Sequence, residues 1–384
     1  MTTVAVHRPV LEWARRRSGR DHSAMRAKFR HWDRWIAGNA HPTFNQAQQF
    51  ADYTHVPFGM LLLPTPPVED LPIPDFRVGH AASDEPSQDL LETIYLSQRR
   101  QGWYEDYLAD LSGGGPLDFV GSALGKSVDE AATMITAALD YGMKPRANLR
   151  TIDGARKYLI HWFEEVGGLV VATSMVGNNS HRMLNLDEFR GFTLHSATAP
   201  LVFINGHDTK RGQVFSLLHE FAHVWRGDSG VSAGGEPLSA ERGEIESWCD
   251  HVAAQIAVPA NDLRMRYAPS GDLTDELERL ADFYKCSTLV VLIRLRDTGL
   301  QPLEGFDKLY AEELGRLLAF INERPESTGG TFYNNQPFRI GETLSRALIQ
   351  DTYGGRTPMT EALSLMSFKS APVFDKYAES LGQG

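Results

Sequence analysis

The chain contains 384 residues, more than one hydrophobic core usually serves, so its ordinary globular composition of 42% hydrophobic and 23% charged residues predicts two or three structural units. A formal net charge of −11 argues against nucleic-acid binding by the chain as a whole. Because no apolar run approaches the roughly 18 residues of a membrane span and no secretory signal is recognisable, we expect a cytoplasmic protein without membrane contact.

The first 64 residues read as short helices and form the first predicted domain. We expect these helices over residues 10–18, 23–38 and 44–56, with Thr43 as the N-cap of the third. Residues 1–60 contain nine Lys and Arg against four acidic residues, a net charge of +5, so this is the segment whose charge suits DNA. Five prolines between residues 64 and 76 then interrupt helical structure and mark a domain boundary.

Three further segments follow this boundary. We predict a proline-rich linker with a helical segment over residues 65–150, a domain of strands and helices over 151–300, and a C-terminal helical region over 301–384. In the middle domain, strands are expected over residues 169–173, 189–195 and 200–205, and helices over 212–225 and 244–258. The predicted fold is therefore α+β and mainly helical, with a small antiparallel or mixed sheet packed on a pair of helices.

The sequence HEFAH lies at residues 219–223, inside the first helix of that pair. His219 and His223 are four residues apart, so both imidazoles lie on one helix face and reach a single ion. Glu220 lies beside the first of them, where it can accept a proton from a zinc-bound water. This spacing predicts a Zn²⁺ site with two histidine ligands and a glutamate as general base.

A catalytic zinc usually has three protein ligands, and Glu246 is the predicted third. The glycine-rich loop after His223 lets the second helix fold back, which places its first turn opposite the two histidines. Competing ligands on that helix are Glu244, Cys249, Asp250 and His251. Asp250 shares a face with Glu246 and is also suited to accept the free N–H of a ligand histidine.

Other interpretations of these residues remain open. Two histidines four apart also occur in helices for packing reasons, and a structural zinc would need four protein ligands where three are evident. The strand at residues 200–205 is expected at a sheet edge, where an extended substrate would pair with it. His207, Arg211 and Arg77 are candidate substrate contacts, but isolated polar residues of this kind are more often structural. Cys249 and Cys286 fit no disulfide framework and are expected to be reduced and buried.

The segments PLVFINGHDTKRGQVFSLLHEFAHV and ESWCDHVAAQIAVP together resemble the core of the ImmA/IrrE family of metallopeptidases. The similarity extends to PIPDFR at residues 72–77, to LADFYKCSTLVVLIRL and to GGTFYNNQPFRIGETLSRAL near the end, so it covers nearly the whole chain. Residues 35–57 resemble the third and fourth helices of a Cro/C1-type helix-turn-helix. They depart from that pattern at Ile36, where an acidic residue is usual.

This resemblance implies a zinc metalloendopeptidase that cleaves a specific partner protein, typically a repressor, in stress response or mobile-element control. Some long members of the family are paired with toxin-like proteins. The alternative is therefore an antitoxin or transcriptional regulator that uses the peptidase-like fold for protein contact and binds DNA through residues 1–64.

Overall fold

A computed structural model describes residues 2–68, 70–77, 86–111, 114–233, 243–268, 272–302, 304–322 and 331–383. The chain divides into two compact units. The first consists of Met1–Pro72 with His80–Tyr95, and the second consists of Ile73–Gly79 with Leu96–Gly384. The polypeptide therefore leaves the first unit at the proline-rich segment, contributes a few residues to the second, and then returns. In the described part of the chain, no helix is long and apolar enough to cross a membrane.

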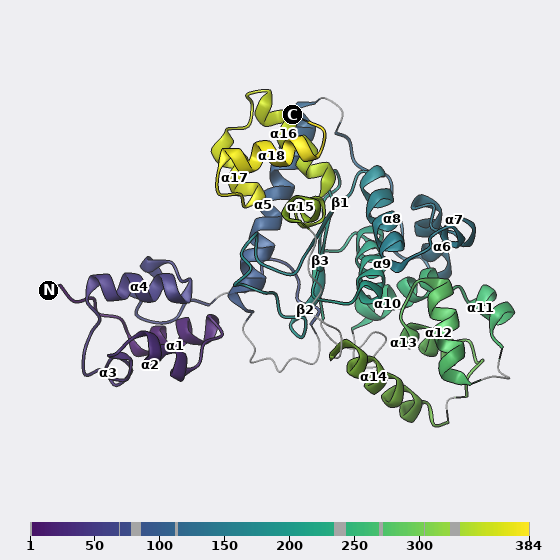
Figure 1. The fold of residues 1–384 in the computed structure, drawn as a ribbon, viewed down its shortest axis with the longest axis horizontal. Coiled ribbons are helices and arrows are strands. Elements are labelled where there is room, and N and C mark those ends of the chain that lie inside the picture. The colour runs from purple at the N-terminus through teal and green to yellow at the C-terminus, as the bar shows by residue number, and fades with distance from the viewer. Residues whose placement is uncertain are drawn as a thin grey trace. The chain divides into compact units, whose positions relative to one another are not determined.

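The first unit is a small all-helical body (Figure 1). Its elements are α1 (Arg8–Arg17), α2 (His22–Lys28), α3 (Trp32–Ile36), α4 (Phe44–Thr54), the short 3₁₀ helix η1 (Phe58–Leu62) and the start of α5 (Gln88–Asp110). Thr43 and Gln46 form a capping box at α4, which confirms the predicted N-cap. The helix expected over residues 23–38 is instead two helices, because the backbone of Phe29 is extended and ends α2.

Aromatic side chains fill the interior of the first unit. Trp32 stacks on Phe50 with their ring centroids 5.8 Å apart, and Phe29 meets Phe50 edge to face at 5.6 Å. Trp13 and Trp35 are buried in the same cluster. Fully buried aromatic rings remove a large apolar area from water, so four short helices make a core despite their length.

The second unit is built around a four-stranded mixed sheet with the order β1-β3-β2-β4. The strands are β1 (Leu169–Thr173), β2 (Phe189–Leu194), β3 (Leu201–Asn205) and β4 (Gly230–Ala233). β1 pairs with β3 in parallel, whereas β2 is antiparallel to both of its neighbours. This agrees with the predicted α+β class and small mixed sheet. The expectation that residues 200–205 form an edge strand is wrong, because β3 has a hydrogen-bonded neighbour on each side.

A stretch of the proline-rich segment covers the outer side of β4. Phe76 donates its backbone N–H to the carbonyl of Val231 at 3.1 Å, and Val231 donates to the carbonyl of Pro74 at 3.0 Å. Gly230 makes room for the Phe76 ring, since an ideal Cβ at residue 230 would lie 2.1 Å from that ring. Both outward-facing backbone groups of Val231 are therefore satisfied by the chain itself.

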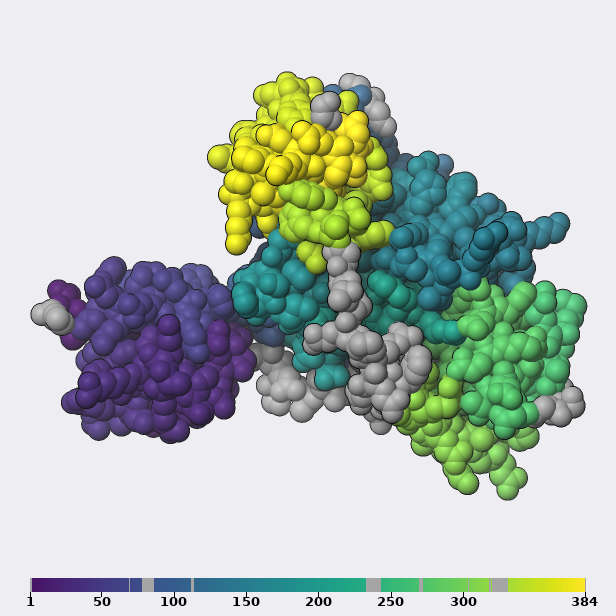
Figure 2. Space-filling model, viewed as in Figure 1, coloured from purple at the N-terminus to yellow at the C-terminus, as the bar shows by residue number. Residues whose placement is uncertain are grey.

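Helices surround this sheet and supply the remaining core. They are α6 (Val128–Ala138), α7 (Met143–Ala147), α8 (Ile152–Glu165), α9 (Lys210–Arg226), α10 (Glu244–Ala257), α11 (Ala260–Arg266), α12 (Leu273–Tyr284), α13 (Thr288–Asp297), α14 (Phe306–Asn322), α15 (Phe332–Ile340), α16 (Glu342–Tyr353), α17 (Met359–Met366) and α18 (Ala371–Ser380). α9 packs against α10, α8 and the sheet, so it lies at the centre of the unit. Helices α15 to α18 gather into one lobe at the end of the chain (Figure 2).

Candidate metal centre

Helix α9 places two imidazoles in the interior of the second unit. Thr209 caps its first turn by accepting from the N–H of Gly212, and Gly227 ends it with a φ of 91°, a left-handed conformation that favours glycine. Every residue from Gln213 to Trp225 is buried. A helix that is buried on all sides leaves its polar residues no contact with bulk water, so they need partners within the fold.

Helix α10 supplies the carboxylate that meets them. It begins after Gly243, and Glu246 lies in its first turn with a relative exposure of only 1%. A carboxylate at this position is favoured by the positive end of the helix dipole. The packing of α10 against α9 brings Glu246 to His219 and His223, which are both buried.

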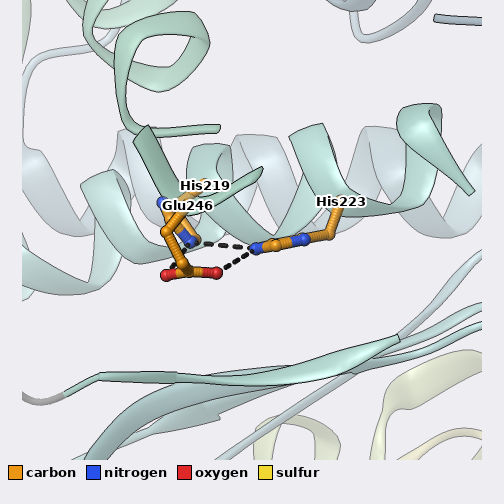
Figure 3. Close-up of side chains that lie close together, drawn as sticks. All are labelled: His219, His223 and Glu246. Atoms are coloured by element: carbon orange, nitrogen blue, oxygen red, sulfur yellow. Dashed lines mark hydrogen bonds and ion pairs between the residues drawn. The ribbon is translucent and has the colours of Figure 1, made fainter. Parts of the chain in front are cut away.

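The three side chains face one common point (Figure 3). His219 Nε2 and His223 Nε2 are 3.2 Å apart, His223 Nε2 lies 2.9 Å from Glu246 Oε1, and His219 Nε2 lies 3.4 Å from Glu246 Oε2. Tetrahedral zinc with bonds of 2.0 to 2.1 Å separates its ligand atoms by about 3.3 Å. The three donor atoms therefore already have the spacing and chemistry of a zinc ligand set, and this group fits a metal ion.

The charges within the group shift the pKa values of His219 and Glu246 in opposite directions. Burial disfavours charge on His219, but the carboxylates of Glu246 and Asp250 outweigh it and raise the pKa of His219 to about 10. Burial likewise opposes ionisation of Glu246, yet the charge and hydrogen bonds of the two imidazoles hold its pKa far below the usual range. Glu246 is therefore kept ionised although it is buried, and the ionised carboxylate is the form that binds a cation.

Neighbouring groups orient the two histidines. Asp250 Oδ1 lies 2.9 Å from His219 Nδ1, so the predicted carboxylate partner is in contact with the outer ring nitrogen. Such contacts fix the ring orientation and the tautomer of a ligand histidine. On the other side, the ring of Phe76 stacks on that of His223, with centroids 5.7 Å apart and planes only 6° from parallel.

Glu220 is buried beside the group and faces the sheet. Its Oε2 accepts a hydrogen bond of 2.7 Å from the Thr193 hydroxyl on β2. Burial raises the pKa of Glu220, whereas the two imidazoles and the hydroxyls of Thr193 and Ser232 lower it. Burial outweighs the opposing groups, so the pKa of Glu220 lies above its ordinary value, as is common for carboxyl groups that exchange protons in catalysis.

The competing ligands from the sequence lie elsewhere. Glu244 is exposed, Cys249 is a buried free thiol, and His251 is exposed and contacts Ser247 on its own helix. The three candidate substrate contacts do not belong to the buried group of His219, His223 and Glu246 either. His207 is exposed, Arg211 bonds to Cys286 and Asp282, and Arg77 bonds to Asp75 and Glu188.

Three residues beside Glu220 or His223 are not predicted from the sequence, namely Gly191, Thr193 and Phe76. The first two are separated by one residue within a predicted strand, so the twofold alternation of a strand puts them on one face. This alternation can be read from the sequence, but it does not identify the helix that packs on the face with Gly191 and Thr193. Phe76 follows two prolines in an irregular segment, and nothing local indicates that it returns to β4.

Comparison with known protein families adds an independent finding to this geometry. Residues 164–296 match the IrrE N-terminal-like domain, the family Peptidase_M78. The matched IrrE N-terminal-like domain contains all four strands and helices α9 to α12, and hence His219, Glu220, His223 and Glu246. Residues 340–380 match a domain of unknown function, DUF8813, which corresponds to α16 to α18. Neither match reaches residues 1–64, and no curated protein matches the chain.

Proposed function

We propose that this protein is a zinc-dependent metalloendopeptidase. The observation that carries the proposal is the convergence of His219, His223 and Glu246 within one buried group, inside a domain that matches a peptidase family. Three protein ligands leave a coordination position for water or substrate, which distinguishes a catalytic zinc site from a structural one. The described part of the chain provides no fourth His, Cys, Asp or Glu in this group.

Each protein group has a definite task in this proposal. His219, His223 and Glu246 would hold the ion, and Asp250 would keep His219 in the tautomer that presents Nε2. Zinc in such a site lowers the pKa of water toward about 7 and polarises a carbonyl group. Glu220 would accept the proton of the attacking water and donate it to the amide nitrogen as the C–N bond breaks.

The substrate we propose is a specific regulatory protein, of the repressor type, in stress response or mobile-element control. This rests on the resemblance of the sequence to the ImmA/IrrE family. Substrate pairing with β3 is excluded by the sheet order, because that strand is interior. An extended substrate would also meet Pro74 and Phe76 on the outer side of β4.

Purified protein should be incubated with each repressor-type protein encoded by a neighbouring gene, with and without EDTA, while bound zinc is measured separately. Glu220→Gln should keep about one zinc per chain and lose cleavage, whereas Glu246→Gln should lose zinc. Glu244→Gln, which changes an exposed carboxylate on the same helix, serves as the matched control and should retain both. Full cleavage by Glu220→Gln, or absence of zinc from the wild type, would overturn the proposal.

A second candidate is an antitoxin or transcriptional regulator that binds DNA through residues 1–64. It is favoured by six exposed cations on the first unit, Arg8, Arg16, Arg26, Lys28, Arg30 and Arg34. Promoter DNA from upstream of the chain's own gene should then shift in a gel, less so at higher salt, and lose the shift when residues 1–64 are deleted. A shift that survives this deletion would assign DNA binding to another part of the protein.

A further inference from the structure

The carboxylate of Glu220 lies against β2, in a space lined by Gly191 and Thr193 that we call the cradle. Gly191 and Thr193 lie two apart on β2, so they share the face that α9 covers, and Phe192 between them points to the other face and stacks on Phe203. Gly191 and the Thr193 hydroxyl therefore both meet the Glu220 carboxylate from β2.

Thr193 provides the directional contact in this cradle. Its hydroxyl lies 2.7 Å from Glu220 Oε2 and 3.2 Å from the backbone carbonyl of Glu220. Thr193 is fully buried and Glu220 nearly so, with relative exposures of 0% and 1%. A charge-assisted hydrogen bond out of reach of bulk water is strong and directional, so it restricts the rotation of the carboxylate.

Gly191 provides the space. An ideal Cβ at residue 191 would lie 2.8 Å from Glu220 Oε1 and 2.8 Å from the carbonyl oxygen of Phe203. Gly191 does not have a positive φ, so the backbone conformation alone does not require glycine at this position. The steric requirement is instead the closeness of two groups, the Glu220 carboxylate and the backbone carbonyl of Phe203.

We propose that Thr193 is a positioning residue that fixes the orientation of the Glu220 carboxylate next to the metal, with Gly191 leaving the room it needs. This inference rests on the proposed function, because it concerns the orientation of Glu220, the proton acceptor in that reaction. A general base must lie within hydrogen-bond reach of the proton it takes, and a freely rotating carboxylate spends only part of its time there.

Acetohydroxamate binding to the zinc-loaded protein tests this without any peptide substrate. A hydroxamic acid gives up its O–H proton when it chelates zinc, so a neighbouring carboxylate that accepts the proton strengthens binding. Thr193→Val removes the hydroxyl at nearly constant size and should weaken acetohydroxamate binding about 10-fold, the effect of one charge-assisted hydrogen bond. Thr193→Ser keeps the hydroxyl and should stay within about 3-fold of the wild type.

The decisive comparison is made in the Glu220→Gln background. If Thr193 acts through Glu220, adding Thr193→Val to Glu220→Gln should change acetohydroxamate affinity by less than about 2-fold. Zinc content and thermal unfolding are measured for each variant to separate misfolding from mispositioning. If Thr193→Val does not fold, Thr193→Ala provides the second test, because it removes the same hydroxyl without adding atoms to the sheet, and it should weaken binding similarly.

The outcomes separate the two proposals. Equal weakening by Thr193→Val and Thr193→Ser, or the same weakening in the Glu220→Gln background, would overturn the positioning role while leaving the peptidase proposal intact. A wild-type protein that binds neither zinc nor acetohydroxamate would overturn both. Weakening that requires Glu220 and is rescued by serine would establish the role of Thr193.

Discussion

Arg146 permits a sharp test of how the fold holds the candidate metal centre. Its buried guanidinium donates to the carbonyl oxygens of Ala257 at 2.6 Å, Ile256 at 2.8 Å and Tyr141 at 2.9 Å. Ala257 is the last residue of α10, and the end of an α-helix leaves its carbonyls without helical partners. Arg146 therefore completes the helix that carries Glu246.

Replacing this side chain should destabilise the whole second unit. Arg146→Met keeps much of the volume but removes all three hydrogen bonds, and each buried carbonyl left without a partner costs about 1 to 3 kcal/mol. Burial lowers the pKa of Arg146, so removing the charge recovers part of that loss. The expected net decrease in the free energy of unfolding is about 3 kcal/mol.

Urea unfolding followed by circular dichroism measures this difference. Lys144→Met is the matched control, because Lys144 is exposed on the same short helix α7 and its replacement should change the free energy by less than about 0.5 kcal/mol. Zinc affinity, measured by competition with a fluorescent chelator, should fall in Arg146→Met and stay unchanged in the control. If the two variants unfold at the same urea concentration, the reasoning about the end of α10 is refuted.

Two further predictions concern ionisable groups outside the centre. Burial raises the pKa of Glu164 to about 8 from the ordinary 4.5, so the unfolded chain ionises first and the free energy of unfolding falls as pH rises through this window. Glu164→Gln should remove about 2 kcal/mol of the fall between pH 5 and 8.5 in urea unfolding, a value reduced for partial exposure, whereas exposed Glu165→Gln should not. The same pH dependence in both variants would contradict this. Cys249 and Cys286 are buried thiols whose pKa values are raised by burial, so Ellman's reagent should label neither in native protein and both in urea. Rapid labelling before unfolding would show that the thiols are accessible.

Local patterns in the sequence were sufficient for the elements of the centre. The four-residue spacing of His219 and His223 needs only helix geometry, and Glu246 follows from a second helix that folds back. The order of the strands cannot be predicted in this way, because an apolar run such as that of β3 occurs in edge strands and in interior strands alike. An interior position depends on pairing with two distant segments.

Long-range contacts account for the other gaps. Arg146 contacts carbonyls more than a hundred residues away, and Thr193 meets Glu220 only after β2 and α9 have packed. The alternation of β2 places Thr193 on one face of the strand but does not identify the helix that covers this face, and no periodic pattern marks Arg146. Residues that orient a site through tertiary contacts are therefore the part of the chemistry that one sequence reveals least.

The pairing of Pro74 and Phe76 with Val231 has a practical consequence for producing the protein in parts. A fragment that begins at residue 96 would contain the whole region matched to the peptidase family. Its strand β4 would, however, lack the hydrogen bonds that Pro74 and Phe76 make on its outer side. A bare strand of this kind invites pairing between molecules. Such a fragment is expected to aggregate at concentrations where the full chain stays monodisperse, and supplying residues 73–77 as a peptide should restore its solubility.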